Sequence, residues 1–169
     1  MRIVIRPLEA KDEREFIAAA RRSRKLHGPW VYPPSTVRAF RAYLVRSGRG
    51  ANHTFAARIR GSGEIVGVVS VSEIVRGAFE SAYLGYYAFE PHAGKGLMSE
   101  AVSSVIDHAF RSLKLHRLEA NIQPGNKDSI ALVKRLGFKR EGYSPRYLKI
   151  GGRWQDHERW AVLREEWMR

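Results

Sequence analysis

The stretch from Leu84 to Ser112 constrains the fold of this chain most, because it joins a strand, a glycine turn and a helix. Aromatic and aliphatic residues at 84–89 indicate a buried strand, and the turn Pro91–Gly96 follows it. Beyond the turn, apolar residues recur at three- and four-residue steps: Val102, Val105, Ile106, Ala109, Phe110 and Leu113. This spacing predicts an amphipathic helix packed on the core.

The glycine turn predicts an anion site. The first backbone N–H groups of a helix have no partner within the helix, and the helix dipole is positive there. Gly94 and Gly96 lack the Cβ atoms that would keep a phosphate away, and Lys95 adds a cation. The turn is no P-loop. A degraded dinucleotide fingerprint with Glu119 as the ribose acid, or a plain connecting turn, are the alternatives.

The whole chain, residues 1–169, predicts a single domain of class α/β (α+β), with one mixed, largely antiparallel sheet flanked by helices. We expect one parallel, right-handed crossover, from the strand at 84–89 through the central helix to a strand at 116–123. The other expected strands lie at 3–7, 53–60, 64–76, 139–150 and 154–163. The other expected helices lie at 12–26, at 35–47 with Ser35 as N-cap, and from Asn126 or Asp128 to Gly137.

Several segments resemble the GCN5-related N-acetyltransferase (GNAT) superfamily. The run His92-Ala93-Gly94-Lys95-Gly96 resembles its acetyl-CoA pyrophosphate loop, with His92 in place of the first basic residue. Asn126–Phe138 resembles a second block of the superfamily. Ile5–Asp12 and Tyr147–Trp167 resemble the subgroup of ribosomal-protein alanine N-terminal acetyltransferases. The resemblance covers nearly the whole chain, and it implies a GNAT fold and an acetyl-CoA-dependent N-acetyltransferase.

The resemblance also implies where acetyl-CoA binds. The strand at 84–89 would splay from the strand at 116–123, and the pantetheine arm would lie between them. Backbone groups near Tyr87, Ala88 and Phe89 would bind this arm, and Asn126 would bond to it unless it serves only as a helix cap. The pyrophosphate would lie on the loop that starts at His92. The residues implied there are Gly94, Lys95, Gly96, Leu97 and Met98.

Acetyl transfer needs a base for the amine and a donor for the leaving thiolate. The chain has no cysteine, which excludes an acetyl-cysteine intermediate, disulfides and thiolate-zinc sites, and leaves direct attack by the amine. By resemblance Glu119 is the base, unless it only pairs with an arginine. Many relatives have a tyrosine acid where Val133 stands, so Ser129 is the implied donor, unless it is only a first-turn helix serine.

The implied acceptor is a protein N-terminal α-amine, with a ribosomal protein as first choice. A small amine, such as a polyamine or an amine-bearing antibiotic, and a non-catalytic protein that binds CoA or RNA are the alternatives. Trp30 and Tyr32, in a proline-rich loop, could wall the acceptor cleft or cap the core. We expect no metal site, because the adjacent Asp156 and His157 would point to opposite faces of a strand.

The net charge of +13 is the outlier of the composition. A basic surface favours polyanions, so contact with ribosomal RNA is one interpretation, and an arginine-rich composition spread evenly over the surface is the other. No stretch approaches the roughly 20 apolar residues of a membrane span, so no membrane partner is expected. The N-terminus alternates like a strand and meets acidic residues early, which is unlike a signal peptide and predicts a cytoplasmic protein.

Overall fold

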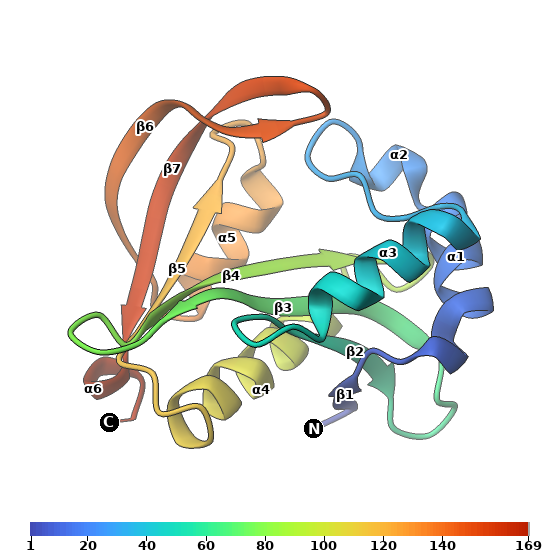
Figure 1. The fold of residues 1–169 in the computed structure, drawn as a ribbon, viewed down its shortest axis with the longest axis horizontal. Helices are drawn as coiled ribbons and strands as arrows, with labels where there is room; N and C mark the ends of the chain where they lie inside the picture. Colours follow the sequence, from blue (N-terminus) through green and yellow to red (C-terminus); the bar gives the residue numbers. More distant parts are fainter. Residues whose placement is uncertain (169) are drawn as a thin grey trace.

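The computed structural model describes residues 1–168 and contains one seven-stranded sheet with the order β1-β2-β3-β4-β5-β7-β6 (Figure 1). Every neighbouring pair is antiparallel except β4 and β5, which are parallel. The predicted mixed sheet and the parallel pairing of its crossover are therefore confirmed. The strands are β1 (Ile3–Pro7), β2 (His53–Ile59), β3 (Ile65–Val75), β4 (Ser81–Ala88), β5 (Arg117–Ile122), β6 (Lys139–Ile150) and β7 (Arg153–Leu163).

Helices pack on both faces of the sheet and form two cores. On one face, α4 (Leu97–Arg111) and α5 (Lys127–Arg135) bury their apolar sides against the strands. On the other face, α1 (Glu13–Arg22) and α3 (Val37–Ser47) pack over β2 and β3 around three phenylalanines: Phe16, Phe40 and Phe89. The short elements are η1 (Ala10–Asp12), α2 (Arg24–His27) and α6 (Arg164–Trp167).

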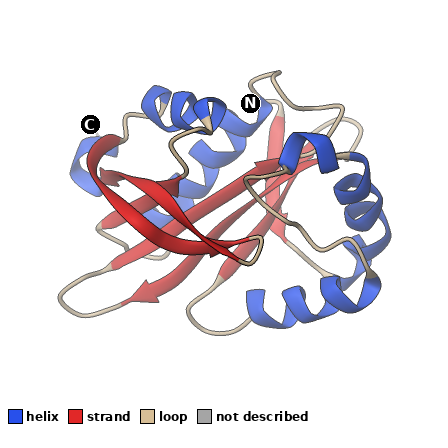
Figure 2. Ribbon diagram, turned by 90° about the horizontal axis from the view of Figure 1, so that it is seen from above, coloured by secondary structure: helices blue, strands red, loops and turns tan. Residues whose placement is uncertain are grey.

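The sheet opens in its middle. β4 and β5 pair only from Ser81 to Tyr83 and from Arg117 to Glu119, while each strand continues to pair with its outer neighbour. Figure 1 shows β5 turning away from β4 beyond this point. Figure 2 shows the long β6–β7 hairpin crossing the open side towards the loop that follows α2. A gap with two unpaired strand edges results.

Three local expectations differ from the structure. The helix expected at 12–26 is divided at Ser23, whose hydroxyl donates to Ala19 O (2.7 Å) and accepts from Glu90 N (2.9 Å). The prediction of Ser35 as an N-cap was wrong, because Thr36 is extended and its Oγ1 accepts from Ala39 N at 3.2 Å. The terminal α6 was not expected.

Candidate active site

A cavity of about 750 Å³ occupies the gap between β4 and β5. The turn before α4, the first turns of α4 and α5, the loop after α2 and the β6–β7 hairpin complete its walls. Eight of the residues expected in the site line it: Tyr87, Ala88, His92, Gly94, Gly96, Met98, Asn126 and Ser129. Phe89, Lys95, Leu97 and Glu119 were also expected there but are not part of the lining.

Two hydrogen bonds show which backbone groups of β4 face the gap. Glu80 O accepts from Arg117 N on the β5 side (3.2 Å), and Phe89 N donates to Val66 O on the β3 side (2.8 Å). Because successive residues of a strand turn their N–H and C=O groups to opposite edges, Tyr86 and Ala88 face the gap. The N–H groups of Tyr87 and Phe89 face β3, so a ligand in the gap would meet Tyr86 and Ala88 instead.

One of these gap-facing groups already has a partner. His27 Nε2 lies 2.7 Å from Ala88 O, so the neutral imidazole can donate to it. Burial lowers the pKa of His27 despite this hydrogen bond, which favours the neutral form. The Ala88 carbonyl is thus occupied by the protein, while its N–H and both backbone groups of Tyr86 remain turned towards the cavity.

The glycine turn has the backbone geometry that the sequence predicts. Gly94 and Gly96 have φ values of 74° and 76°, and Gly96 is the N-cap of α4. Only glycine adopts this left-handed region freely. One cation near the turn was missed: Arg135, at the end of α5, lines the cavity and donates to Ser99 Oγ at 3.0 Å. No local spacing signals this contact, because it joins the ends of two helices.

The first turn of α5 brings two hydroxyl groups together in the cavity. Asn126 Oδ1 accepts from Ser129 N at 3.3 Å, so Asn126 is the N-cap of α5. Ser129 Oγ donates to Tyr86 Oη at 2.7 Å, and Tyr86 Oη donates to the Ser129 carbonyl at 2.9 Å. Sequence reasoning did not single out Tyr86. Val133, where many relatives have a tyrosine, is fully buried in the core.

Glu119 lies where β4 and β5 separate. Leu118 and Ala120 are buried in the core, so Glu119 projects from the opposite face of β5. Its carboxylate pairs with Arg117 at 2.8 Å, and the same guanidinium pairs with Glu141 at 2.5 Å. The expected arginine partner therefore exists, and it holds a carboxylate beside the end of the gap.

The loop after α2 carries two aromatic rings beside the cavity. Trp30 lines it and lies so near Gly125 that a Cβ there would be 2.9 Å from the ring. A Cβ on Gly151, at the tip of the β6–β7 hairpin, would be 2.8 Å from Tyr32. The loop after α2 thus touches both the β5–α5 turn and the hairpin, and it roofs the gap.

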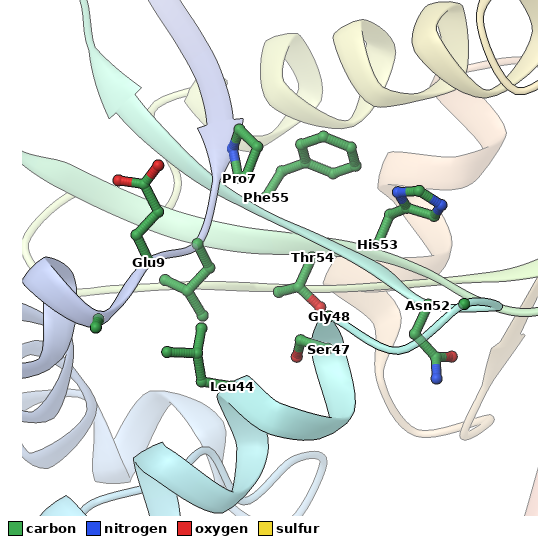
Figure 3. A pocket seen from close by; sticks show the side chains of 12 residues that line it. Pro7, Glu9, Leu44, Ser47, Gly48, Asn52, His53, Thr54 and Phe55 are labelled. Carbon is green, nitrogen blue, oxygen red and sulfur yellow. The ribbon is translucent and has the colours of Figure 1, made fainter.

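Three further observations concern the described residues. Within residues 1–168, no group of three or more His, Asp or Glu side chains is arranged to hold a metal ion. None of the helices in this range is long and apolar enough to cross a membrane. A smaller hollow of about 470 Å³ lies between α3 and the start of β2, lined by Leu44, Thr54 and Phe55 among others (Figure 3). It is separate from the gap between β4 and β5.

Comparison with known proteins fits this geometry. The acetyltransferase (GNAT) domain family matches residues 2–139. The chain belongs to the GNAT acetyltransferase family. Its sequence is 35% identical to "Probable N-acetyltransferase YjcK" of Bacillus subtilis, over 95% of this chain and 93% of that protein. It is 45% identical to the [ribosomal protein uS5]-alanine N-acetyltransferase of Escherichia coli, over 62% of this chain and 54% of that enzyme.

Solved structures of N-acetyltransferases have the same fold as this chain. The ribosomal-protein-S5-alanine acetyltransferase of Vibrio fischeri matches with a TM-score of 0.86 and 28% identity, over 99% of this chain and 96% of that one. The RimJ protein of Mycobacterium smegmatis, solved with CoA-disulfide, matches with a TM-score of 0.88 and 27% identity, over 97% of this chain and 83% of that one. This GNAT protein is therefore an N-acetyltransferase, and its fold is one that holds CoA.

Proposed function

We propose that this GNAT enzyme transfers the acetyl group of acetyl-CoA to the N-terminal α-amine of a protein, with a ribosomal protein as the first candidate. The observation that carries the proposal is the gap between β4 and β5, which ends at a glycine turn on the N-terminus of α4. A gap with free strand edges suits an extended arm that bears amides, and the turn suits the attached phosphates.

Acetyl-CoA would lie in this gap. The pantetheine amides would bond to the backbone of Tyr86 and to the N–H of Ala88, with Asn126 at the other side. The pyrophosphate would meet the N–H groups from Gly94 to Met98, with Lys95 and Arg135 as cations; the other loop residues proposed there are His92, Gly96 and Leu97. These groups hold the thioester while the amine approaches.

The chemistry would need few groups. Glu119, directly or through water, would take the proton of the incoming amine, and the neutral nitrogen would attack the thioester carbon. The C–S bond would break, and Ser129 would stabilise the thiolate. Arg117, which pairs with Glu119 at 2.8 Å, would keep the carboxylate in position.

A protein α-amine loses its proton more easily than a lysine side chain. An α-amine titrates near 7.7–8.0 and a lysine side chain near 10.4, so losing the proton at neutral pH costs the lysine about 3 kcal/mol more. A site with one arginine-paired carboxylate fits the more acidic ammonium better. The loop that carries Trp30 and Tyr32 contacts the β5–α5 turn and the β6–β7 hairpin, and a cleft walled by it would favour a narrow chain end with a small first residue, alanine or serine. The similarity to uS5-alanine acetyltransferases supports this choice.

A panel of amines tests the proposal. The enzyme is incubated with acetyl-CoA and peptides starting with Ala, Ser, Leu or acetyl-Ala, with internal lysines, and with spermidine. Free thiol release gives the rate, and mass spectrometry locates the acetyl group. We expect acetylation of the α-amine of the Ala and Ser peptides and none of the acetyl-Ala control. Acetylation of lysine side chains, or of spermidine alone, would replace the protein N-terminus with a different acceptor.

The small-amine alternative has a specific basis. A spermidine N(1)-acetyltransferase of Vibrio cholerae is 27% identical over 62% of this chain. The net charge of +13 opposes it mildly, because a basic surface repels a polycation. Contact of that surface with ribosomal RNA stays a prediction from composition.

A further inference from the structure

The hydroxyl groups of Tyr86 and Ser129 form a closed pair in the cavity wall. Each is donor to the other residue: Ser129 Oγ to Tyr86 Oη at 2.7 Å, and Tyr86 Oη to Ser129 O at 2.9 Å. Tyr86 comes from the unpaired part of β4 and Ser129 from the first turn of α5, so the pair bridges the two sides of the gap.

We propose that Tyr86 and Ser129 work as one unit that receives the thiolate leaving acetyl-CoA, Ser129 as its hydrogen-bond donor and Tyr86 as the residue that positions and polarises Ser129. This inference rests on the proposed acetyl transfer and names a residue for it that no local motif indicates. A tyrosine hydroxyl thus reaches the site from β4, although the α5 position of the family's tyrosine is Val133.

The pair can change direction at little cost, because hydroxyl hydrogens rotate. When the amine nitrogen bonds to the carbonyl carbon, the electron pair of the C–S bond goes to sulfur. Ser129 Oγ–H then turns to the sulfur, and Tyr86 Oη–H turns from the Ser129 carbonyl to Ser129 Oγ. The pair supplies hydrogen bonds and no net proton. The proton that the amine lost, carried by the base and water, finally makes the free thiol.

The environment of Tyr86 fits this role. Burial raises the pKa of Tyr86 well above that of a free tyrosine, despite the hydrogen bond from Ser129. The phenol therefore stays protonated at every pH at which the enzyme would work, and it remains a donor. Hydrogen bonds in a chain strengthen one another, which makes Ser129 a better donor towards sulfur than an isolated serine.

The first test needs no acceptor. CoA bound to the protein is titrated, and the ultraviolet absorbance of its thiolate gives the pKa of the bound thiol. Hydrogen bonds to a charged group predict a pKa about one unit higher in Ser129→Ala and about half a unit higher in Tyr86→Phe. The control is Tyr143→Phe, which removes a hydroxyl bonded to Asp156 on the β6–β7 hairpin and should change nothing. An unchanged thiol pKa in Tyr86→Phe would refute the proposal.

The second test uses kinetics on whichever amine the wild-type enzyme acetylates. We expect Tyr86→Phe to lower kcat about tenfold with acetyl-CoA while KM for acetyl-CoA stays within about twofold. The double variant should be no more than about twofold slower than Ser129→Ala, because the two residues act as a unit. With the selenium analogue of acetyl-CoA, whose selenolate leaves more easily, the Tyr86→Phe defect should shrink.

The two tests distinguish a structural role of Tyr86 from a role in stabilising the leaving thiolate. If Tyr86 only ties α5 to β4, the variant will melt earlier and its rate will fall equally with both donors, which contradicts the proposal. If wild-type protein acetylates no amine of the panel, the proposed acceptor is wrong, and the titration of bound CoA still decides the role of Tyr86.

Discussion

Replacing Gly96 by alanine tests the glycine turn as the phosphate site. Gly96 has a φ of 76°, and a Cβ there would meet nothing nearer than Arg2 Nη2 at 3.5 Å, an ordinary contact. The folded protein therefore has room for the methyl group. The cost is the left-handed backbone, about 1–2 kcal/mol for an L residue. For a chain of this length, that lowers Tm by about 2–8 °C.

The effect on CoA should be larger than the effect on stability. A methyl group at Gly96 would stand among the N–H groups of the first turn of α4 and hold a phosphate away from them. Losing one hydrogen bond to a charged group costs about 1.5–3 kcal/mol, which raises Kd for CoA about 10- to 150-fold. Lys95→Ala should raise Kd less than tenfold, because the side chain is exposed and its charge is screened.

Gly77 supplies a matched control. It lies in the β3–β4 turn with a φ of 75° and nothing within 4 Å of a built Cβ. Gly77→Ala should lower Tm by as much as Gly96→Ala and leave CoA binding unchanged. Isothermal calorimetry with CoA and thermal melts of both variants make the comparison. Equal CoA affinity in Gly96→Ala and wild type would refute the phosphate site. Weakened CoA binding in Gly77→Ala would show that the loss in Gly96→Ala is not specific to the glycine turn before α4.

Three further predictions concern the base and the stability of the fold. Glu119→Gln should lower kcat at pH 7 at least tenfold with little change in CoA affinity, and recover partly at high pH where the amine deprotonates unaided; a pH–rate profile equal to wild type would move the base elsewhere. Asp12→Asn should destabilise by about 3 kcal/mol in urea, because Asp12 is 2% exposed and pairs with Arg6 and Arg58; a loss below about 1 kcal/mol would contradict a buried pair. Burial lowers the pKa of His27 below 6.5, so the unfolded chain binds its proton more readily: stability should be constant above about pH 6.5, fall below it, and fall less steeply in His27→Gln. Urea melts from pH 5 to 8 would show no such difference if His27 were exposed.

Local patterns predicted most of the fold. The strand, turn and helix around Gly94 and Gly96 could be predicted because each element has its own hydrophobic periodicity or its own turn residues. The hairpin at Gly151 and Gly152 could be predicted because a glycine pair suits a tight turn, and both residues have positive φ, 59° and 80°. The helix break at Ser23 could not be predicted. It depends on a hydrogen bond from Glu90 N to the Ser23 hydroxyl, and these residues are 67 positions apart.

The site divides in the same way. The sequence predicted that the turn glycines and Asn126 lie at one site, because short-range geometry and family resemblance both point there, and all three line the cavity. Three hydrogen bonds at the site could not be predicted, because each joins elements that only the folded sheet brings together. They link His27 to Ala88 O, Arg135 to Ser99 and Ser129 to Tyr86. The strand-edge assignment also needed the structure, since the direction of an N–H group in β4 depends on which neighbour it pairs with.

The opening between β4 and β5 would bring cofactor binding and acetyl transfer to one place. Arg164 N donates to His116 O on the β7 side, so by alternation Asn121 turns its backbone to the gap, opposite Tyr86. Beyond Tyr83 and Glu119 these backbone groups have no strand partner across the gap, and His27 takes that place at Ala88 O. Amides of the proposed pantetheine arm would bond to the others. Tyr86 reaches Ser129 of α5 from this same unpaired length of β4, so the hydroxyl pair lies beside the proposed cofactor gap.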